Sequence, residues 1–163
     1  MIVLVGFMGA GKSSVGRLLA RRLGLPFVDS DDAVEQRAGR AIREIFAADG
    51  EAAFRALERA TIADLLRGPD VVLALGGGAV EDAATREALR GHDVVYLEVD
   101  LDVALQRVGG DAERPVLRDP QLAARYRTRV PDYTDVATIA VPTAGRSVAD
   151  VADEVLARLA AAS

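Results

Sequence analysis

The feature that most constrains this fold is a glycine-rich loop near the N-terminus. An apolar run, "IVLV" at 2–5, leads into the pattern Gly6-x-x-x-x-Gly11-Lys12-Ser13. A loop of this spacing between a strand and a helix turns its backbone N–H groups toward a phosphate at the start of the helix. The apolar residues that follow the loop have helical spacing: Val15, Leu18, Leu19 and Leu23. The sequence therefore predicts a strand, a loop and a helix that together hold a nucleoside triphosphate.

Two side chains of this loop have predicted chemical roles. Lys12 is expected to reach the β- and γ-phosphates of ATP, and the Ser13 hydroxyl is expected to bind Mg²⁺. Lys12 is the only lysine in a chain that is otherwise rich in arginine, which favours a phosphate-binding role for its compact ammonium. A glycine-rich turn without a ligand is the weaker alternative, because the motif lies between a strand and a helix. The motif leaves open which acceptor receives the phosphate.

The rest of the chain alternates between apolar runs and helical patterns. Strands are predicted at 26–28, 71–75, 93–99 and 137–141, and helices near 83–90, 102–107, 119–128 and 148–160. A long helical stretch is predicted after the second strand, with a break near 48–50 and a second helix at about 51–66. This alternation predicts an α/β fold with three layers, α/β/α, around a five-stranded parallel sheet. The length fits one domain, 1–163.

Composition narrows the classes of function. The chain has no cysteine and a single histidine, His92, so a disulfide framework, a thiolate metal site and an imidazole cluster are not expected. No apolar run reaches the roughly 20 residues that cross a bilayer, and a cytoplasmic location without membrane partners is predicted. The net charge of −5 argues against broad binding to nucleic acid. Small molecules are the expected partners.

Acidic residues follow the second predicted strand in "DSDD". Asp29, Asp31 and Asp32 should lie at the carboxyl edge of the sheet, where open α/β folds bind ligands. Carboxylates there could hold Mg²⁺ through water and accept a proton from an attacking hydroxyl. Helix capping by one of them is the alternative. If strand geometry persists, alternation points Asp29 and Asp31 the same way, into a shared site.

Arginines and glycines form three further candidate features. Arg55 lies early in the helix that contains "GEAAFRALE", where a solvated surface charge is the alternative. Gly76 to Gly78 end the third strand and would let the backbone approach a ligand, unless they form a plain turn. The segment 107–129 is rich in Gly, Pro, Asp and Arg, as a mobile cover over the γ-phosphate would be. Surface roles are preferred for three of its arginines: Arg118, Arg125 and Arg127.

In its motifs and their order the chain resembles shikimate kinase, a small member of the nucleoside-monophosphate-kinase-like group of P-loop kinases. The matching motifs are the phosphate loop, "DSDD", "AAFRALE", "GGGAV", "AERPVL" and "RVPDY". The resemblance covers essentially the whole chain. It implies transfer of the γ-phosphoryl of ATP to the 3-hydroxyl of shikimate, and it implies a P-loop kinase fold.

The resemblance also implies roles for residues on the acceptor side. Asp29 would hold the hydration shell of Mg²⁺, and Asp31 would bind and orient the shikimate hydroxyl, with a role as catalytic base left open. Arg55 and Arg129 would grip the shikimate carboxylate. Backbone contacts would come from Gly77 and Gly78, and the acceptor-binding region would span about 31–60.

On the nucleotide side, the resemblance implies a lid at about 109–121. Its arginine, Arg114, would act on the phosphates, while Arg107 and Arg146 would pack on adenine. The cofactor-binding loop would comprise Gly9, Ala10, Gly11, Lys12, Ser13 and Ser14. A monomer is expected.

One departure from the family pattern lies before Arg129. Only Arg127 and Thr128 separate it from Tyr126, so the preceding helix is about one turn shorter than usual, which leaves nearly the same face pointing inward.

Two rival functions remain open. A gluconate kinase shares the loop and a sugar-acid substrate, and a regulatory NTP-dependent module would carry an Asp-x-x-Gly switch where this chain has "LGGGAV". The low aromatic content, 4% without Trp, disfavours a nucleotide acceptor.

Overall fold

Five short strands form one parallel sheet in the computed structural model, which describes residues 1–108 and 120–162. The strands are β1 (Ile2–Val5), β2 (Phe27–Asp29), β3 (Val72–Ala74), β4 (Asp93–Glu98) and β5 (Ile139–Pro142). Their order across the sheet is β2-β3-β1-β4-β5, and every pair is parallel. β1 and β3 are buried along their whole length, as the continuous apolar runs of central parallel strands require.

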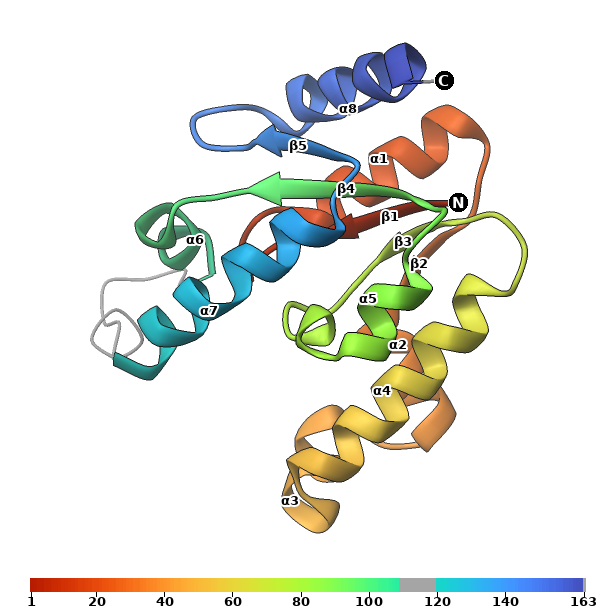
Figure 1. Cartoon of the computed structure of the whole chain (residues 1–163), viewed down its shortest axis with the longest axis vertical. Coiled ribbons are helices and arrows are strands. Elements are labelled where there is room, and N and C mark those ends of the chain that lie inside the picture. Colours follow the sequence, from red (N-terminus) through yellow and green to blue (C-terminus); the bar gives the residue numbers. More distant parts are fainter. Residues whose placement is uncertain (109–119, 163) are drawn as a thin grey trace.

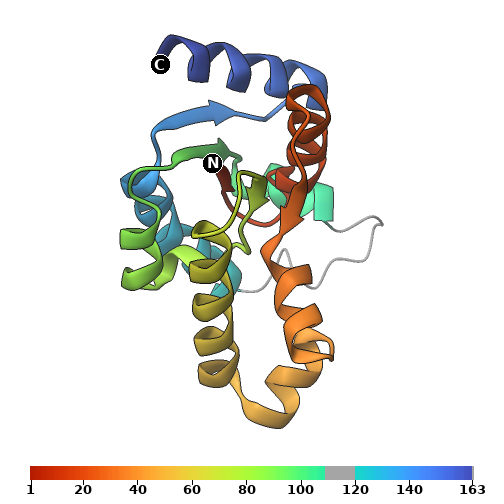
Figure 2. The same cartoon turned by 90° about the vertical axis from the view of Figure 1, so that its right-hand side faces the viewer.

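Helices cover both faces of this sheet (Figures 1 and 2). They are α1 (Lys12–Leu23), α2 (Ser30–Ala38), α3 (Ile42–Asp49), α4 (Glu51–Leu66), α5 (Ala83–Ala88), α6 (Leu101–Val108), α7 (Pro120–Val136) and α8 (Val148–Ala162), with a 3₁₀ turn η1 (Ala79–Glu81). α1 and α8 pack on one face, and α5 and α7 lie on the other. The predicted three-layer α/β/α fold with a five-stranded parallel sheet is confirmed. None of the described helices is long and apolar enough to cross a membrane.

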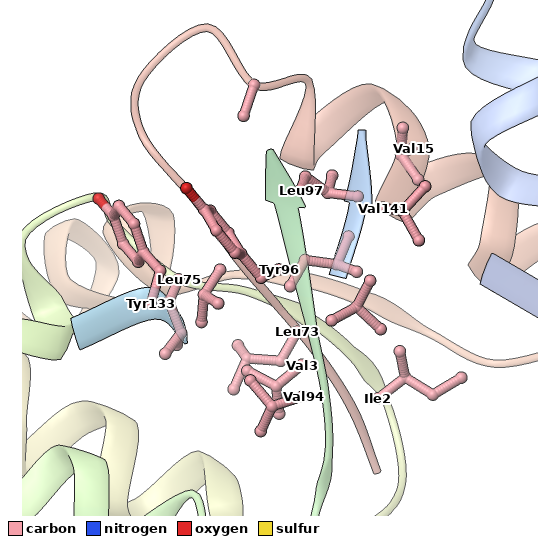
Figure 3. Packing of buried hydrophobic residues seen from close by; sticks show 14 of the residues in the cluster. Ile2, Val3, Val15, Leu73, Leu75, Val94, Tyr96, Leu97, Tyr133 and Val141 are labelled. Atoms are coloured by element: carbon pink, nitrogen blue, oxygen red, sulfur yellow. The ribbon is translucent and has the colours of Figure 1, made fainter. Parts of the chain in front are cut away.

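The main core lies between the sheet and its two helical layers (Figure 3). Val3, Leu73 and Val94 occupy neighbouring strands and are almost completely buried. On the α7 face, the rings of Tyr96 and Tyr133 stack with their centroids 5.3 Å apart. Aromatic stacking adds to the stabilisation from buried area. These contacts hold α7 against β4 close to the carboxyl edge of the sheet.

A second, smaller core belongs to the helical arm formed by α2, α3 and α4. Val34, Ile45 and Phe54 pack together there, one from each helix. In Figure 2 this arm extends away from the sheet, with α2 and α4 side by side and α3 at the far end. Because α2 begins directly after β2, the arm starts at the carboxyl edge of the sheet.

Two predicted helix boundaries are wrong. The long helix expected after Asp32 is divided into α2 and α3, because Gly39 ends α2 in the left-handed conformation, with φ at 69°. The helix expected at 119–128 instead continues to Val136 through Pro131. A proline removes one helical hydrogen bond, but side chains on both sides of Pro131 are anchored to the segment after β3, as described below.

Candidate functional site

The phosphate loop has the geometry of an anion site. Gly11 caps α1 in the left-handed conformation, with φ at 92°, and because it has no side chain it makes no capping hydrogen bond to the first N–H groups of the helix. At the other end of the loop, Gly6 has φ at 149°, and a Cβ there would lie 2.7 Å from the carbonyl oxygen of Leu97. Both positions therefore require glycine. The N-terminus of α1 directs its partial positive charge and its N–H groups into the loop.

Lys12 lies folded over this loop. Its ammonium Nζ donates to the carbonyl oxygens of Gly6 at 2.7 Å and Phe7 at 3.1 Å. Burial lowers the pKa of Lys12 to about 8, although the carboxylates of Asp31 and Asp29 oppose this shift. A bound phosphate would supply the negative charge that compensates this ammonium.

We expect the affinity for ATP to fall as the pH rises above about 8, the pKa of Lys12 without ligand. Bound phosphate favours the protonated amine, so binding above this pH must take up a proton, and the affinity should drop by up to about tenfold per pH unit. Calorimetric titration with ATP on either side of pH 8 measures this. The Lys12→Ala protein should lack this dependence. An unchanged wild-type affinity across the window would contradict the prediction.

Asp29 links the second strand to the phosphate loop. One carboxylate oxygen, Oδ2, accepts a hydrogen bond from the Ser13 hydroxyl at 3.0 Å. The other, Oδ1, accepts from the backbone N–H of Asp31 at 2.9 Å and so caps α2. Asp29 thus caps α2, as the capping alternative expected for one of the aspartates, and it also contacts the phosphate loop through Ser13. Two hard oxygens beside the α1 N-terminus suit Mg²⁺, which takes few protein ligands and relies on water and substrate phosphates.

Asp31 reaches the site from a helix. The expected strand alternation with Asp29 is wrong, because the strand ends at Asp29 and Ser30 begins α2. Asp31 nevertheless faces the loop after β3: a Cβ on Gly76 would lie 2.6 Å from its Oδ1. Burial and then Asp29 raise the pKa of Asp31, while Lys12 and, less strongly, Arg55 act in the opposite direction. A raised pKa makes this carboxylate a better proton acceptor than an ordinary aspartate.

Arg55 and Arg129 converge over Gly78 from two different helices. A Cβ on Gly78 would lie 2.6 Å and 2.8 Å from Nη2 and Nη1 of Arg55, and 2.9 Å from Nη2 of Arg129. Arg129 is only 8% exposed, and its Nη1 approaches Gly77. Two guanidinium groups at one point could together bind a carboxylate. Arg55 is partly buried and paired with Glu58, so it is not a freely solvated charge, and its role toward the acceptor stays a prediction.

The nucleotide side of the loop borders a cavity of about 290 Å³. Its lining includes Arg107 and Arg146 together with Gly9, Ala10, Gly11, Ser14, Val148 and Val151. Arg107 donates to the carbonyl oxygens of Gly9 at 3.2 Å and Thr143 at 2.7 Å. Arg146 is paired with Glu154. The two arginines are thus held at the cavity, and their packing on adenine stays a prediction. Arg114 and nearly all of the expected lid, 109–121, lie outside the described residues.

Three further residues of the site were missed by sequence reasoning. Glu58, 3% exposed, accepts from Arg55 Nη1 at 2.7 Å. Its position three residues after Arg55 on a helix was a usable signal. Ser30 accepts from the N–H of Gly76 at 2.9 Å. Tyr133 donates its hydroxyl to the carbonyl oxygen of Gly77 at 2.5 Å. Ser30 and Tyr133 lie in the motifs "DSDD" and "RVPDY", but no local pattern indicated the contacts that they make.

Comparison with known proteins identifies the family. The family model described as shikimate kinase matches residues 8–160. A shikimate kinase from Mycobacterium avium is 47% identical, covering 98% of this chain and 93% of the relative. The structure of shikimate kinase from Acinetobacter baumannii in complex with shikimate has a TM-score of 0.87 at 38% identity, covering 98% and 92% of the two chains. A gluconokinase from Sinorhizobium meliloti, at 23% identity and a TM-score of 0.65, shares the fold. The chain belongs to the shikimate kinase family.

Proposed function

We propose that this chain transfers the γ-phosphoryl of ATP to the 3-hydroxyl of shikimate, giving shikimate 3-phosphate and ADP. Family membership makes it an ATP-dependent phosphotransferase. The observation that carries the choice of acceptor is the convergence of Arg55 and Arg129 over Gly78. This carboxylate receptor lies in the same site as Asp31, whose environment includes Lys12 of the phosphate loop. An acid that also bears a hydroxyl fits such a site.

The acceptor side positions shikimate for attack. The carboxylate would bind between Arg55 and Arg129, and the backbone of Gly77 and Gly78 would contact the ring. Asp31 would accept a hydrogen bond from the 3-hydroxyl and take its proton as the oxygen attacks the γ-phosphorus. The bond between that phosphorus and the oxygen bridging to the β-phosphate then breaks, and ADP leaves. We propose that region 31–60 is the acceptor-binding part.

The nucleotide side supplies charge and alignment. The N–H groups of the loop and of α1 would hold the phosphates, with Lys12 on the β- and γ-phosphates. Ser13 and Asp29 would hold Mg²⁺, which when bound neutralises phosphate charge. Because the transition state of phosphoryl transfer is loose, these residues act mainly through position and electrostatics.

We also propose that residues 1–163 act as one kinase domain, as a monomer and in the cytoplasm. The exposed large apolar side chains among the described residues are scattered over separate elements: Met8, Leu23, Phe46 and Val148. This scatter supports a monomer, because interfaces need contiguous apolar patches. The net charge of −5 supports small-molecule partners over nucleic acid. A chain without cysteine has no need of an oxidising compartment.

An assay of coupled ADP release tests the proposed function. The purified protein is offered ATP and Mg²⁺ with shikimate, with gluconate, with nucleoside monophosphates, or with no acceptor. We expect ADP release with shikimate only. Turnover with gluconate and not shikimate would establish the sugar-acid alternative, and turnover without an acceptor would establish a nucleotide-hydrolysing switch.

Substituting Gly78 with alanine should weaken shikimate binding selectively. Gly78 has φ at −93° and ψ at −3°, the conformation of the third residue of a type I turn, which is compatible with alanine. The added Cβ would collide with the guanidinium groups of Arg55 and Arg129. We expect the KM for shikimate to rise about tenfold, an effect of displaced binding groups, with the KM for ATP unchanged.

A second glycine of the same turn provides the comparison for this experiment. Among the described residues, the atom nearest to a Cβ on Gly77 would lie 3.6 Å away, so Gly77→Ala should raise the KM for shikimate less than Gly78→Ala does. Equal effects of the two substitutions would show that the turn as a whole matters, and not the space that the arginines occupy.

A further inference from the structure

We infer that Glu81 is a positioning residue that orients Arg129 for the acceptor carboxylate. Glu81 ends η1, just after the glycine turn, and its Oε1 accepts from Arg129 Nε at 2.9 Å. The inference rests on the proposed function, because it takes Arg129 as a ligand of the shikimate carboxylate. No part of the sequence pattern singled out Glu81.

The geometry of the guanidinium explains the role. Its N–H groups lie in one rigid plane, and two of its edges can each form a pair of hydrogen bonds. Glu81 occupies the Nε edge of Arg129. Nη1 and Nη2 are then turned toward Gly77 and Gly78, where Arg55 also arrives. Fixing one edge of the plane therefore fixes the direction in which the other donors face.

The charges around the site support the same role. Arg55 is paired with the buried Glu58 at 2.7 Å and, at 3.7 Å, with Glu51. Within 1–108 and 120–162, Glu81 is the only carboxylate that forms an ion pair with Arg129. Two guanidinium groups over one glycine repel each other, and Arg129 has little freedom to move away because it is buried. The hydrogen bond from Nε to Glu81 keeps the plane of Arg129 from turning away from Arg55 under this repulsion.

The backbone of Glu81 is itself held in place. Arg86 donates to the carbonyl oxygens of Val80 at 2.6 Å and Glu81 at 3.0 Å. Arg86 also pairs with Asp132 on α7, at 3.7 Å. The turn that carries Glu81 is thus tied to the helix that carries Arg129. Although the Glu81 side chain is 40% exposed, it differs from a loose surface carboxylate in having a fixed backbone and a buried partner.

Three substitutions of Glu81 separate orientation from charge. Glu81→Ala removes both the acceptor oxygen and the charge, and the KM for shikimate should rise about tenfold, with kcat and the KM for ATP changed by less than about twofold. Glu81→Gln keeps the length and the oxygen that accepts from Nε, so its KM should stay within about threefold of wild type. Glu81→Asp keeps the charge but is shorter, and it should resemble Glu81→Ala. The control is Glu87→Ala, an exposed carboxylate paired only with Arg90 among the described residues, which should change nothing.

A double substitution shows whether Glu81 acts through Arg129. In an Arg129→Ala background, Glu81→Ala should raise the KM for shikimate no further. A further tenfold rise of the KM in that background would overturn the inference. A wild-type KM in Glu81→Asp together with a raised KM in Glu81→Gln would also overturn it, because Glu81 would then act through its charge and not through orientation. A Glu81→Ala protein with an unchanged or lowered KM would also overturn it. Failure of the wild-type protein to phosphorylate shikimate would instead refute the proposed function.

Discussion

Replacing Lys12 with alanine is expected to lower kcat for shikimate phosphorylation by about 10³-fold or more, the scale of a lost transition-state charge donor. Among the described residues, the hydrogen bonds of the ammonium go to the carbonyl oxygens of Gly6 and Phe7 in the phosphate loop. Burial lowers its pKa to about 8, so the folded protein holds this cation at a cost when no phosphate is present. The substitution would remove the cation that we propose to lie on the phosphates, and it breaks no ion pair between described side chains.

The measurement combines kcat from coupled ADP release with the midpoint of thermal unfolding. The unfolding midpoint of Lys12→Ala should equal or exceed that of the wild type, because an under-compensated buried charge is lost. Arg21→Ala, on the exposed side of the same helix, is the matched control and should leave kcat unchanged. Turnover near the wild-type rate in Lys12→Ala would remove the phosphate-loop assignment. A large fall in the unfolding midpoint would show that Lys12 mainly supports the fold.

The sheet could be predicted because its central strands β1, β3 and β4 are mostly buried. A strand such as β1 is buried along its whole length within the apolar core, so the sequence shows a continuous apolar run that no surface requirement interrupts. The helix boundaries at Gly39 and Pro131 were harder for a different reason. Gly39 ends α2 although the apolar pattern continues, whereas Pro131 lies inside α7 although local preference would end a helix there. Contacts distant in sequence decide such cases, and local propensity does not report them.

The candidate site was predictable where a short motif carries the chemistry. Lys12 and Ser13 lie in one loop whose spacing already implies a phosphate. The roles of Arg55 and Arg129 came from family resemblance, since the two residues meet only through the packing of α4 and α7 on either side of Gly78. Glu81 could not be found from the sequence, because its partner lies 48 positions away.

Replacing Arg55 with alanine is expected to raise the KM for shikimate about 100-fold, which corresponds to about 3 kcal/mol for a lost charge-assisted contact. Arg55 directs both Nη atoms to the space over Gly78. On the proposed binding mode, the loss would leave Arg129 as the remaining guanidinium for the acceptor carboxylate. The KM for ATP should barely change, because the phosphate loop makes no contact with Arg55 among the interactions described for it.

The Lys replacement and a control on the same helix complete this test. Arg55→Ala also leaves Glu58 buried without its cation, and burial already raises the pKa of Glu58 while the pair with Arg55 lowers it. Arg55→Lys keeps a charge for Glu58 but cannot supply two parallel donors, so it should recover the fold and only part of the affinity for shikimate. Arg67→Ala, exposed at the far end of α4 and paired with Asp64, should leave both KM values unchanged. Equal damage to shikimate and ATP binding in Arg55→Ala, or none to shikimate, would place the acceptor carboxylate elsewhere and reopen the choice of substrate.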